Sequence, residues 1–447
     1  MTETSDRLLS VEEARAGVLD SIEGPVGTES VATDRSLGRV LAAPVVAAVS
    51  LPPWDNSAMD GYALRAADTA GASEEAPVRL DVIGDIAAGS AATSAVAPGT
   101  AVRIATGAPV PAGADAVVPV ESTTPLDESG SQGRRGRDAT GPLPAATLVH
   151  EIVQPGLSIR RAGSDLVEGT TLLEPGRRMT PATIALAAGA GVPDVTAYER
   201  PKVAVLATGD EVRAPGDPLG PAGIPDANGP GLRALLEAAG CESIDLGIAR
   251  DDLDDVLGKL RRGLDEGAHA LIVSGGVSVG PFDVVKAAIE SIGQIDLWRV
   301  AVQPGKPFAF GTAERPNGGP PALVFGLPGN PVSSFVTFEL FVRPALRRLA
   351  GRRDLLRPAD RAVLLDPVTK GHGRRAFVRV ISDRSDAGAP NRDVQGRVKV
   401  RLAGGQGGQG SHVISALAAA DALAIIPESV DALDAGSAVA LWWLDET

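Results

Sequence analysis

Apolar and polar residues follow a clear repeating pattern between about residues 200 and 350. Three continuous apolar runs, at 202–207, 270–274 and 323–325, have the character of buried strands. They alternate with segments whose apolar residues recur every three or four positions, at 232–239, 253–264, about 282–292 and about 331–349. This alternation predicts βαβ units and a mostly parallel sheet covered by helices on both faces.

The chain on either side of this region has a different pattern. Residues 8–20 predict a helix that Ser10 caps, with Glu13 at the capping-box position. Short strands are predicted at 78–83, 101–104 and 116–120, and a short helix at 180–191. Residues 123–146 lack any period, which is typical of a flexible surface insertion. Short strands return after residue 355 and predict a small β domain.

These patterns predict a multidomain α/β protein, and the length of 447 residues suggests roughly three domains. We expect an elongated linking domain made from 1–50 and 147–176, whose first helix could pack on the central domain. A β-rich domain would span 51–146, including the insertion at 123–146. The doubly wound α/β domain would span 177–328, and a connecting helix with the C-terminal β domain would follow at 329–447.

Composition and charge narrow the class of protein. An apolar content of 44% excludes global disorder. The net charge of −14 disfavours nucleic acid and anionic membranes as partners. The single cysteine, Cys241, excludes an intramolecular disulfide framework and a cysteine-based zinc site, and we interpret it as a buried structural residue. No apolar run approaches the ~20 residues of a membrane span, and the start lacks a signal-peptide core, so we expect a cytoplasmic protein.

Three glycine-rich loops directly follow the three predicted strands. In open parallel sheets, ligands bind outside the carboxyl ends of the strands, where such loops meet. Glycine lets backbone N–H groups approach phosphate oxygens, and the next helix N-terminus favours negative charge. One loop would be a weak signal, but three in one sheet predict a phosphate site. Its candidate residues are Thr208, Gly209, Asp210, Ser274, Gly275, Gly276, Ser278, Gly280, Pro328, Gly329 and Asn330.

Charged side chains accompany these loops. The carboxylates of Asp210, Glu211, Asp251, Asp252 and Asp283 would suit Mg²⁺, which is commonly held by one or two carboxylates plus substrate oxygens. Helix capping remains an alternative, above all for Asp283 in the first turn of its helix. Basic counterparts are Arg299, Lys306 and Arg343, of which Lys306 is held in a Pro-Gly-Lys-Pro turn.

Three further segments allow a structural or a functional reading. Segments 53–63 and 103–111 are polar or rich in Gly and Pro, and either could be only a connection. Residues 405–410 match the dinucleotide-binding pattern of glycines. Fewer than 40 residues follow that match, too few for a second half of such a domain. We therefore interpret it as a glycine-rich loop of the C-terminal β domain.

Seven motifs in one order make the chain similar to a known family. They are PPWDNSAMDGYAL, RIATGAPVPAGADAVVPVE, VLATGDEV, the D-x-N of residues 226–228, SGGVSVGPFDVVK, PGKPFAFG and VFGLPGNPVSSF. This set resembles the molybdopterin molybdenumtransferases, the bacterial MoeA family, which is similar to the E domain of gephyrin. The motifs run from about residue 50 to 345, with weaker similarity toward both ends.

The resemblance implies an elongated homodimer of four-part subunits, with the molybdopterin-binding domain at about 177–328. The implied reaction inserts molybdate into adenylylated molybdopterin with Mg²⁺, releases AMP and yields molybdenum cofactor. The implied site lies between subunits, with segments from 50–110 facing the partner's 200–330 domain. The family's functional positions correspond here to Asp60, Thr106, Glu211, Asp251, Asp283 and Lys306, with Glu211, Asp251 and Asp283 as metal ligands. Further implied ligand contacts are Asp226, Asn228, Pro304, Gly305, Arg375 (or Arg374) and Ser411.

The chain departs from the family pattern at Gln303, where many members have lysine, and at Ala227, where serine is usual. Two other readings remain open. One is molybdopterin adenylyltransferase, the enzyme of the preceding step, which resembles the 200–330 domain alone and could also be a partner. The other is a non-catalytic cofactor-binding scaffold, because the gephyrin E domain also clusters receptors.

Overall fold

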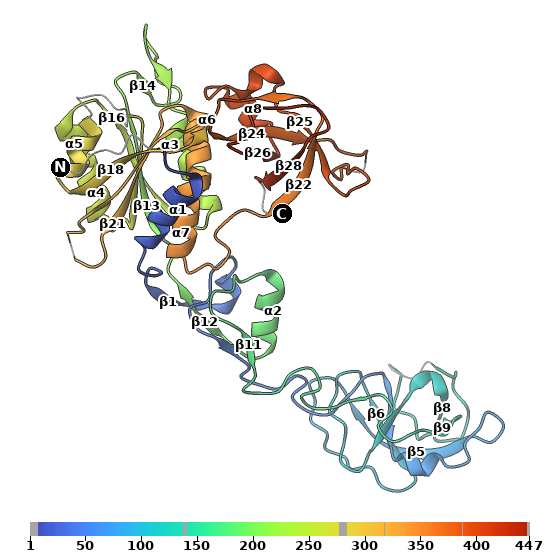
Figure 1. The fold of residues 1–447 in the computed structure, drawn as a ribbon. Helices are drawn as coiled ribbons and strands as arrows, with labels where there is room; N and C mark the ends of the chain where they lie inside the picture. The colour runs from blue at the N-terminus through green and yellow to red at the C-terminus, as the bar shows by residue number, and fades with distance from the viewer. Residues whose placement is uncertain (1–7, 137–140, 277–283, 317, 387, 445–447) are drawn as a thin grey trace.

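The computed structural model describes residues 8–136, 141–276, 284–316, 318–386 and 388–444. The molecule is elongated (Figure 1). A central α/β domain and a C-terminal β domain lie side by side at one end, a β-rich domain lies at the other, and a narrow linking domain joins them. None of the described helices is long and apolar enough to cross a membrane.

The central domain is built on a six-stranded sheet with the strand order β16-β13-β17-β21-β20-β18. The predicted strands correspond to β13 (Lys202–Thr208), β17 (Ala270–Ser274) and β21 (Ala322–Leu327), which are parallel to one another. The pattern did not predict β16 (Glu242–Ala249), β18 (Gly293–Arg299) or β20 (Pro307–Ala313). The edge strands β16 and β18 carry exposed polar residues and so lack a continuous apolar run. Strands β18 and β20 run antiparallel, so the sheet is mixed at this edge.

Helices cover both faces of this sheet, as predicted. On β13, Val203 and Val205 enter one apolar cluster, while Ala204 and Leu206 enter the cluster on the opposite face. This division follows from the period of two along a strand. One face packs against α3 (Asn228–Ala238), α6 (Pro331–Thr337), a π-helical turn (Phe338–Val342) and α7 (Arg343–Leu349), and the other against α4 (Leu253–Asp265) and α5 (Val284–Glu290).

The N-terminal helix α1 (Val11–Asp20) packs on the central domain. Its predicted capping box is confirmed, because Ser10 Oγ accepts a hydrogen bond from the Glu13 N–H at 3.1 Å and Glu13 Oε2 accepts one from the Ser10 N–H at 2.8 Å. The apolar face of α1 enters the same core as α3, α6 and α7. Cys241 also lies in this core, 5% exposed, as predicted.

The linking domain contains two short antiparallel pairs. Strand β1 (Thr28–Ala32) pairs with β12 (Asp194–Tyr198), and β2 (Val45–Val46) pairs with β11 (Thr171–Leu173). Helix α2 (Pro181–Gly189) packs on them, with Thr180 as its N-cap. Because α2 and β12 belong to this core and not to the central sheet, we propose that the central domain starts near residue 200.

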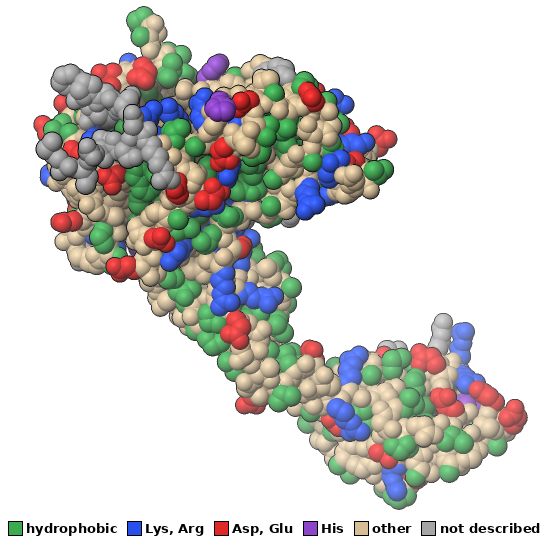
Figure 2. All heavy atoms as spheres, viewed as in Figure 1, with side chains coloured by type: hydrophobic (Ala, Val, Ile, Leu, Met, Phe, Trp, Pro, Cys, Tyr) green, Lys and Arg blue, Asp and Glu red, His purple; other side chains and the backbone are tan. Residues whose placement is uncertain are grey.

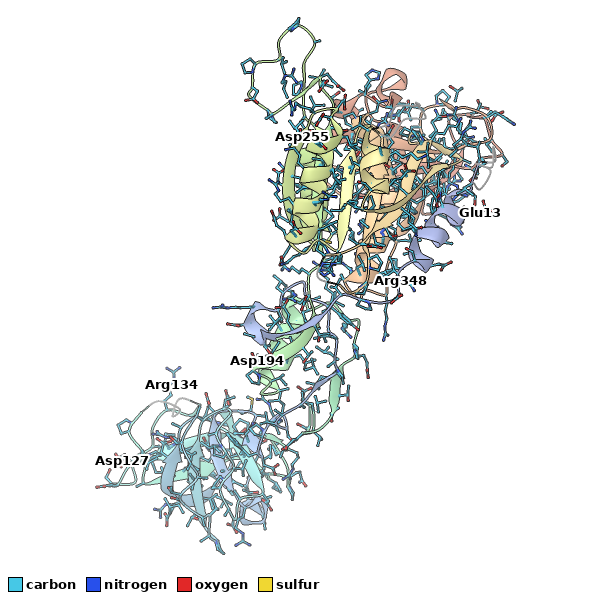
Figure 3. All side chains as sticks on the ribbon, turned by 90° about the vertical axis from the view of Figure 1, so that its left-hand side faces the viewer. Glu13, Asp127, Arg134, Asp194, Asp255 and Arg348 are labelled. Atoms are coloured by element: carbon cyan, nitrogen blue, oxygen red, sulfur yellow. The ribbon has the colours of Figure 1, made fainter. Side chains whose placement is uncertain are left out.

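The β-rich domain has a six-stranded sheet in the order β7-β4-β6-β5-β9-β8. Residues 123–126, which have no strand pattern, form β8 and pair with β9. Asp127 and Arg134 follow β8 and lie on the surface of this domain (Figure 3). The strands are β3 (Asn56–Ser57), β4 (Gly61–Leu64), β5 (Val78–Ile86), β6 (Thr100–Ile104), β7 (Ala116–Pro119), β8 (Thr123–Leu126), β9 (Ala146–Val149) and β10 (Ile159–Arg160), the last paired with β3.

The C-terminal domain is a small closed barrel. Strand β24 pairs with β25, β25 with β22, β22 with β28, β28 with β26, and β26 again with β24. The glycine-rich segment 405–410 is a loop with a 3-10 turn on this barrel, as interpreted from the sequence. The elements are β22 (Ala359–Leu364), β23 (Val368–Thr369), β24 (Arg375–Ser382), β25 (Val398–Leu402), α8 (Ile414–Ala418), β26 (Ala422–Ile426), β27 (Ala432–Leu433) and β28 (Ala438–Trp443).

Three short strands lie beside the central sheet. Strands β14 (Val212–Arg213) and β15 (Ile224–Pro225) form the base of an arm that projects from the central domain (Figure 1). Strand β19 (Val302–Gln303) pairs with β24 and so joins the central domain to the barrel.

Charged side chains of both signs are interspersed over all parts of the face shown in Figure 2.

Candidate functional site

A cavity of about 1210 Å³ lies between the carboxyl ends of the central strands and the C-terminal barrel. Its volume exceeds the upper range of typical ligand pockets, roughly 1,000 Å³. The central domain supplies most of the wall, and the barrel supplies His412 and Ile414. The predicted site residues that line it are Thr208, Gly209, Glu211, Asp226, Asn228, Asp251, Ser274, Gly275, Gly276, Lys306, Pro328, Gly329 and Asn330.

Asn228 holds the loops of this cavity together. Its Nδ2 donates to Ser274 Oγ at 2.7 Å and to the Gly329 carbonyl at 2.8 Å, so one amide joins the loops after β17 and β21 to the start of α3. The Gly275 N–H also donates to the Leu327 carbonyl at 3.2 Å. The three loops predicted from separate parts of the sequence therefore meet at one wall.

The glycines in these loops occupy conformations that other residues rarely adopt. Gly209, Gly275 and Gly276 have φ values of +135°, +94° and +67°. A Cβ at Gly275 would lie 2.7 Å from the Thr208 carbonyl oxygen. Beside them, Thr208 Oγ1 is buried and has no hydrogen-bond partner within the described part of the chain. A buried hydroxyl without a partner is costly, so this atom is a candidate contact for a ligand.

The carboxylates predicted around the loops divide into two groups. Asp252 Oδ1 accepts from the Asp255 N–H at 3.0 Å and caps α4, and Asp226 Oδ1 accepts from the N–H groups of Asn228 and Gly229 at the start of α3. The capping alternative therefore holds for Asp252, whereas Asp226 holds the start of α3 and also lines the cavity. Asp251 and Glu211 also line the cavity, and Asp251 Oδ2 accepts from the Asp210 N–H at 3.4 Å.

The described residues contain no cluster of three or more His, Cys, Asp or Glu side chains that could hold a metal by itself. Glu211 and Asp251 both line the cavity and offer carboxylate oxygens, the ligand type that Mg²⁺ prefers. The third predicted ligand, Asp283, lies outside the described residues, as do Ser278 and Gly280.

Two cationic side chains reach the cavity. Lys306 and Arg299 both line it, and the Val300 N–H donates to the Lys306 carbonyl at 3.0 Å, which fixes the Lys306 backbone beside the end of β18. Arg343, the third basic residue noted in the sequence, is not at the cavity. It is 3% exposed, and its Nε lies 3.7 Å from Glu339 Oε2 within the helix.

Several other predicted contacts lie near the cavity without lining it. Pro304 and Gly305 lie beside α6, since a Cβ at Gly305 would be 2.6 Å from Thr337 Cγ2. The carbonyl of Ser411 accepts from the Val332 N–H at 3.2 Å. The Arg375 side chain instead binds Glu12 of α1 and, at 2.9 Å, Glu428.

Arg379 is a residue near the site that the sequence analysis did not single out. Its side chain is fully buried and donates to the carbonyls of Gly408 at 2.6 Å and Gly410 at 3.2 Å. Burial lowers its pKa to about 10, so it remains a cation at neutral pH. It therefore holds the glycine loop that leads to His412. A polar residue with buried neighbours on a strand could have indicated this role.

Ile224 and Ile414 were also not predicted. Both line the cavity although they are 53% and 44% exposed. Their side chains, from the arm and from the barrel, give the cavity an apolar part.

Asp60 and Thr106 form a pair in the β-rich domain, far from this cavity in the same chain (Figure 1). Asp60 Oδ1 accepts from the Thr106 N–H at 2.7 Å and from Thr106 Oγ1 at 2.8 Å. Two segments distant in sequence thus form one exposed polar surface beside the start of β4 and the end of β6.

Comparisons with known protein families show which class of protein this chain belongs to. Three family models match in order: the MoeA N-terminal region (domain I and II) at residues 9–191, a probable molybdopterin binding domain at 204–348, and the MoeA C-terminal region (domain IV) at 361–444. The molybdopterin-binding model covers the sheet and loops that line the cavity.

Whole-chain relatives then identify the family. Molybdopterin molybdenumtransferase 2 of Mycobacterium tuberculosis is 39% identical over 92% of this chain and 94% of its own length. The molybdopterin molybdenumtransferase of Haemophilus influenzae is 34% identical over 97% and 98%. The crystal structure of a molybdopterin biosynthesis MoeA protein from Pyrococcus horikosii superposes with a TM-score of 0.77 at 31% identity, covering 99% of this chain and 100% of that one. The chain belongs to the molybdopterin molybdenumtransferase family.

Proposed function

We propose that this protein inserts molybdate into adenylylated molybdopterin, releasing AMP and yielding molybdenum cofactor. The observation that carries the proposal is the cavity itself, which is lined by three glycine-rich loops, three carboxylates and two cationic side chains. Family membership supports the same reaction. The cavity is also large enough for a ligand that combines a nucleotide with a pterin.

Cavity residues of different charge would bind different parts of the substrates. Backbone N–H groups of the loops after β13, β17 and β21 would hold the phosphate oxygens, and Thr208 Oγ1 would donate a further hydrogen bond. Lys306 and Arg299 would neutralise the molybdate dianion, which the net charge of −14 otherwise repels. Glu211 and Asp251, with Asp283, would hold Mg²⁺, which supplies Lewis-acid polarisation of the phosphoanhydride when bound.

A homodimer with a shared site is the second part of the proposal. Asp60 and Thr106 are exposed on the β-rich domain, and the elongated linking domain separates them from the cavity of their own chain (Figure 1). A partner subunit could present the same pair to this cavity. We also propose a cytoplasmic location, and substrate transfer from the adenylyltransferase of the preceding step.

The test combines purified protein with adenylylated molybdopterin, Mg²⁺ and molybdate and measures AMP release. We expect molybdate-dependent AMP, a lower rate without Mg²⁺, and a loss of at least about tenfold for Lys306→Ala. The control Lys259→Ala changes a lysine on α4 that pairs with Asp255 and does not line the cavity. Absence of molybdate-dependent AMP would contradict the proposal. Formation of pyrophosphate from ATP and molybdopterin would favour the adenylyltransferase reading instead.

A further inference from the structure

A buried carboxylate lies where the central domain meets the barrel. Helices α6 and α7 are continuous through the π-helical turn Phe338–Val342, and Glu339 in that turn is only 2% exposed. π-Helical turns are rare and occur often at functional positions. An acidic side chain buried to this degree needs compensating charges or hydrogen bonds.

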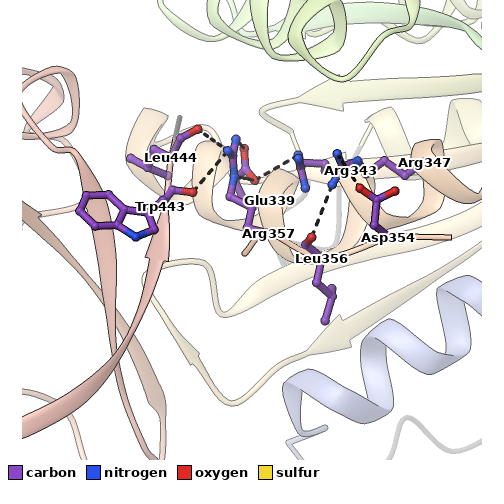
Figure 4. Close-up of polar contacts among 8 residues, drawn as sticks. All are labelled: Glu339, Arg343, Arg347, Asp354, Leu356, Arg357, Trp443 and Leu444. Carbon is purple, nitrogen blue, oxygen red and sulfur yellow. Dashed lines mark hydrogen bonds and ion pairs between the residues drawn. The ribbon is translucent and has the colours of Figure 1, made fainter. Parts of the chain in front are cut away.

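Arg357 supplies that compensation from the segment between α7 and β22. Its Nε and Nη2 donate to the two Glu339 carboxylate oxygens at 2.6 and 2.8 Å, which is a bidentate arrangement. Its Nη1 donates to the carbonyl of Leu444, and to that of Trp443 at 3.4 Å, at the end of the last barrel strand (Figure 4). One guanidinium therefore contacts the central-domain helix and the barrel at once.

Helix α7 holds the same connecting segment at a second point. Arg347 Nη1 donates to the Leu356 carbonyl at 3.4 Å, and Arg347 Nη2 lies 3.7 Å from Asp354 Oδ2 (Figure 4). Burial lowers the pKa of Arg347 to about 9 and that of Arg343 to about 10, so both stay positively charged at neutral pH. Apolar contacts accompany the charges, because Phe377 and Leu423 of the barrel enter the core of the central domain.

These contacts bear directly on the ligand cavity. The same helix that carries Glu339 begins at Pro331, which lines the cavity next to Asn330. The barrel that Arg357 contacts supplies His412 and Ile414 to the lining of the same cavity. A buried ion pair is weak support for stability, because well-packed apolar residues often replace it without loss. Its directional contacts can instead specify one arrangement of the parts that it joins.

We propose that Glu339 and Arg357 are positioning residues that hold the barrel against helix α6 and so set the width of the ligand cavity. The inference concerns the cavity and does not depend on which ligand occupies it. In this role the pair contributes little to stability and much to the geometry of the site.

The test separates geometry from stability with the double variant Glu339→Gln/Arg357→Met, which removes the buried ion pair and leaves a side-chain oxygen for Arg343, whose Nε lies 3.7 Å from Glu339 Oε2. Spin labels at Glu266→Cys on the central domain and Ile381→Cys on the barrel report the distance between the two domains. Both positions are exposed and neither lines the cavity. The native Cys241 thiol is buried, and burial raises its pKa to about 12, so it should not be labelled.

The matched control is Arg352→Met. Arg352 binds Asp354 in a bidentate pair at 3.0 and 2.7 Å within the same connecting segment, and among the described residues this pair has no hydrogen bond to the barrel. We expect the double variant to unfold near the wild-type temperature, to show a broader distance distribution and to raise KM for the adenylylated substrate about tenfold with a smaller change in kcat. The control should show none of these changes.

A distance distribution as narrow as that of the wild type would overturn the inference, since the apolar contacts alone would then hold the barrel. If the double variant fails to fold, Arg357→Lys is measured instead. Lysine keeps the charge but cannot form the bidentate contact, and an unchanged distribution in that variant would equally overturn the inference. The distance measurement needs no turnover, so it remains informative even if the proposed reaction is not observed.

Discussion

Individual residues of the site acquire distinct roles only from their neighbours. Asp251 and Asp252 are adjacent acids with the same chemistry, yet Asp252 caps α4 and Asp251 faces the cavity. Asn228 appears in the sequence as the end of a D-x-N motif, and its two side-chain hydrogen bonds join loops from residues 274 and 329. Residue type and motif therefore identified the candidate site residues, while contacts between distant segments determined the role of each one.

Gly209→Ala should displace the candidate metal ligand Glu211. The new Cβ would lie 2.6 Å from Glu211 Oε2, at a φ of +135° that alanine disfavours. We expect AMP release to fall at least about tenfold and to need more Mg²⁺, as measured by titrating Mg²⁺. Gly216→Ala is the control, because Gly216 has φ +97° but nothing within 4 Å of a Cβ. Equal losses in both variants would show that backbone strain alone is responsible.

His269 should make stability depend on pH below 6.5. Burial, with the charges of Arg315 and Lys202, lowers its pKa to about 4, and its Nδ1 accepts a hydrogen bond from the Lys202 N–H at 3.0 Å. The unfolded chain binds a proton at higher pH than the folded chain, so this contribution is present above pH 6.5 and is lost as pH falls toward 4.

The measurement is urea unfolding at several pH values between 7 and 4, for the wild type and for His269→Asn. The variant should lose less stability over this range. His372→Asn serves as the control because the His372 side chain is 88% exposed. An unchanged pH dependence in the His269 variant would argue against the assignment.

The sequence pattern predicted helices and strands correctly where one or both faces of the element are buried. Helix α1, strand β17 and helix α4 lie close to their predicted positions because an amphipathic period, a cap or a continuous apolar run marks each of them. The pattern did not predict strands β16 and β18, because they lie at sheet edges and carry exposed polar residues. Strand β8 likewise depends on its partner β9, about twenty residues away.

Ser10→Ala should destabilise the attachment of α1. The change removes the hydroxyl that accepts the Glu13 N–H, and loss of an N-cap typically costs about 0.5–2 kcal/mol. Because α1 packs on the central core, the urea midpoint of the central domain should fall. Ser10→Asp keeps an oxygen acceptor and should restore most of the midpoint. If Ser10→Ala unfolds like the wild type, α1 packing does not depend on its cap.

Across the whole molecule, the separation of Asp60 and Thr106 from the cavity suggests an intersubunit site. Asp60→Ala and Lys306→Ala change different domains (Figure 1). Each variant alone should be inactive. When the two are refolded together or co-expressed, mixed dimers should contain one intact site, and activity should return to about a quarter of the wild-type value for random pairing.

The measurement is AMP release by the mixture, and the control is a mixture of Lys306→Ala with Asp251→Ala, which change the same cavity. That control should stay inactive. Recovery in neither mixture would contradict a shared site, and so would full activity of either single variant.

Local periodicity, caps and glycine-rich loops were enough to indicate the doubly wound domain, its three ligand loops and the family. These features depend on residues close in sequence, and they are visible without knowing which segments touch. Other features could not be predicted from the sequence pattern. They are the closure of the C-terminal barrel, the hydrogen bonds by which Asn228 joins two loops, the burial of Arg379, and the contact of Arg357 with both domains. Each depends on packing between distant segments, since burial and hydrogen-bond partners are set only when the domains come together.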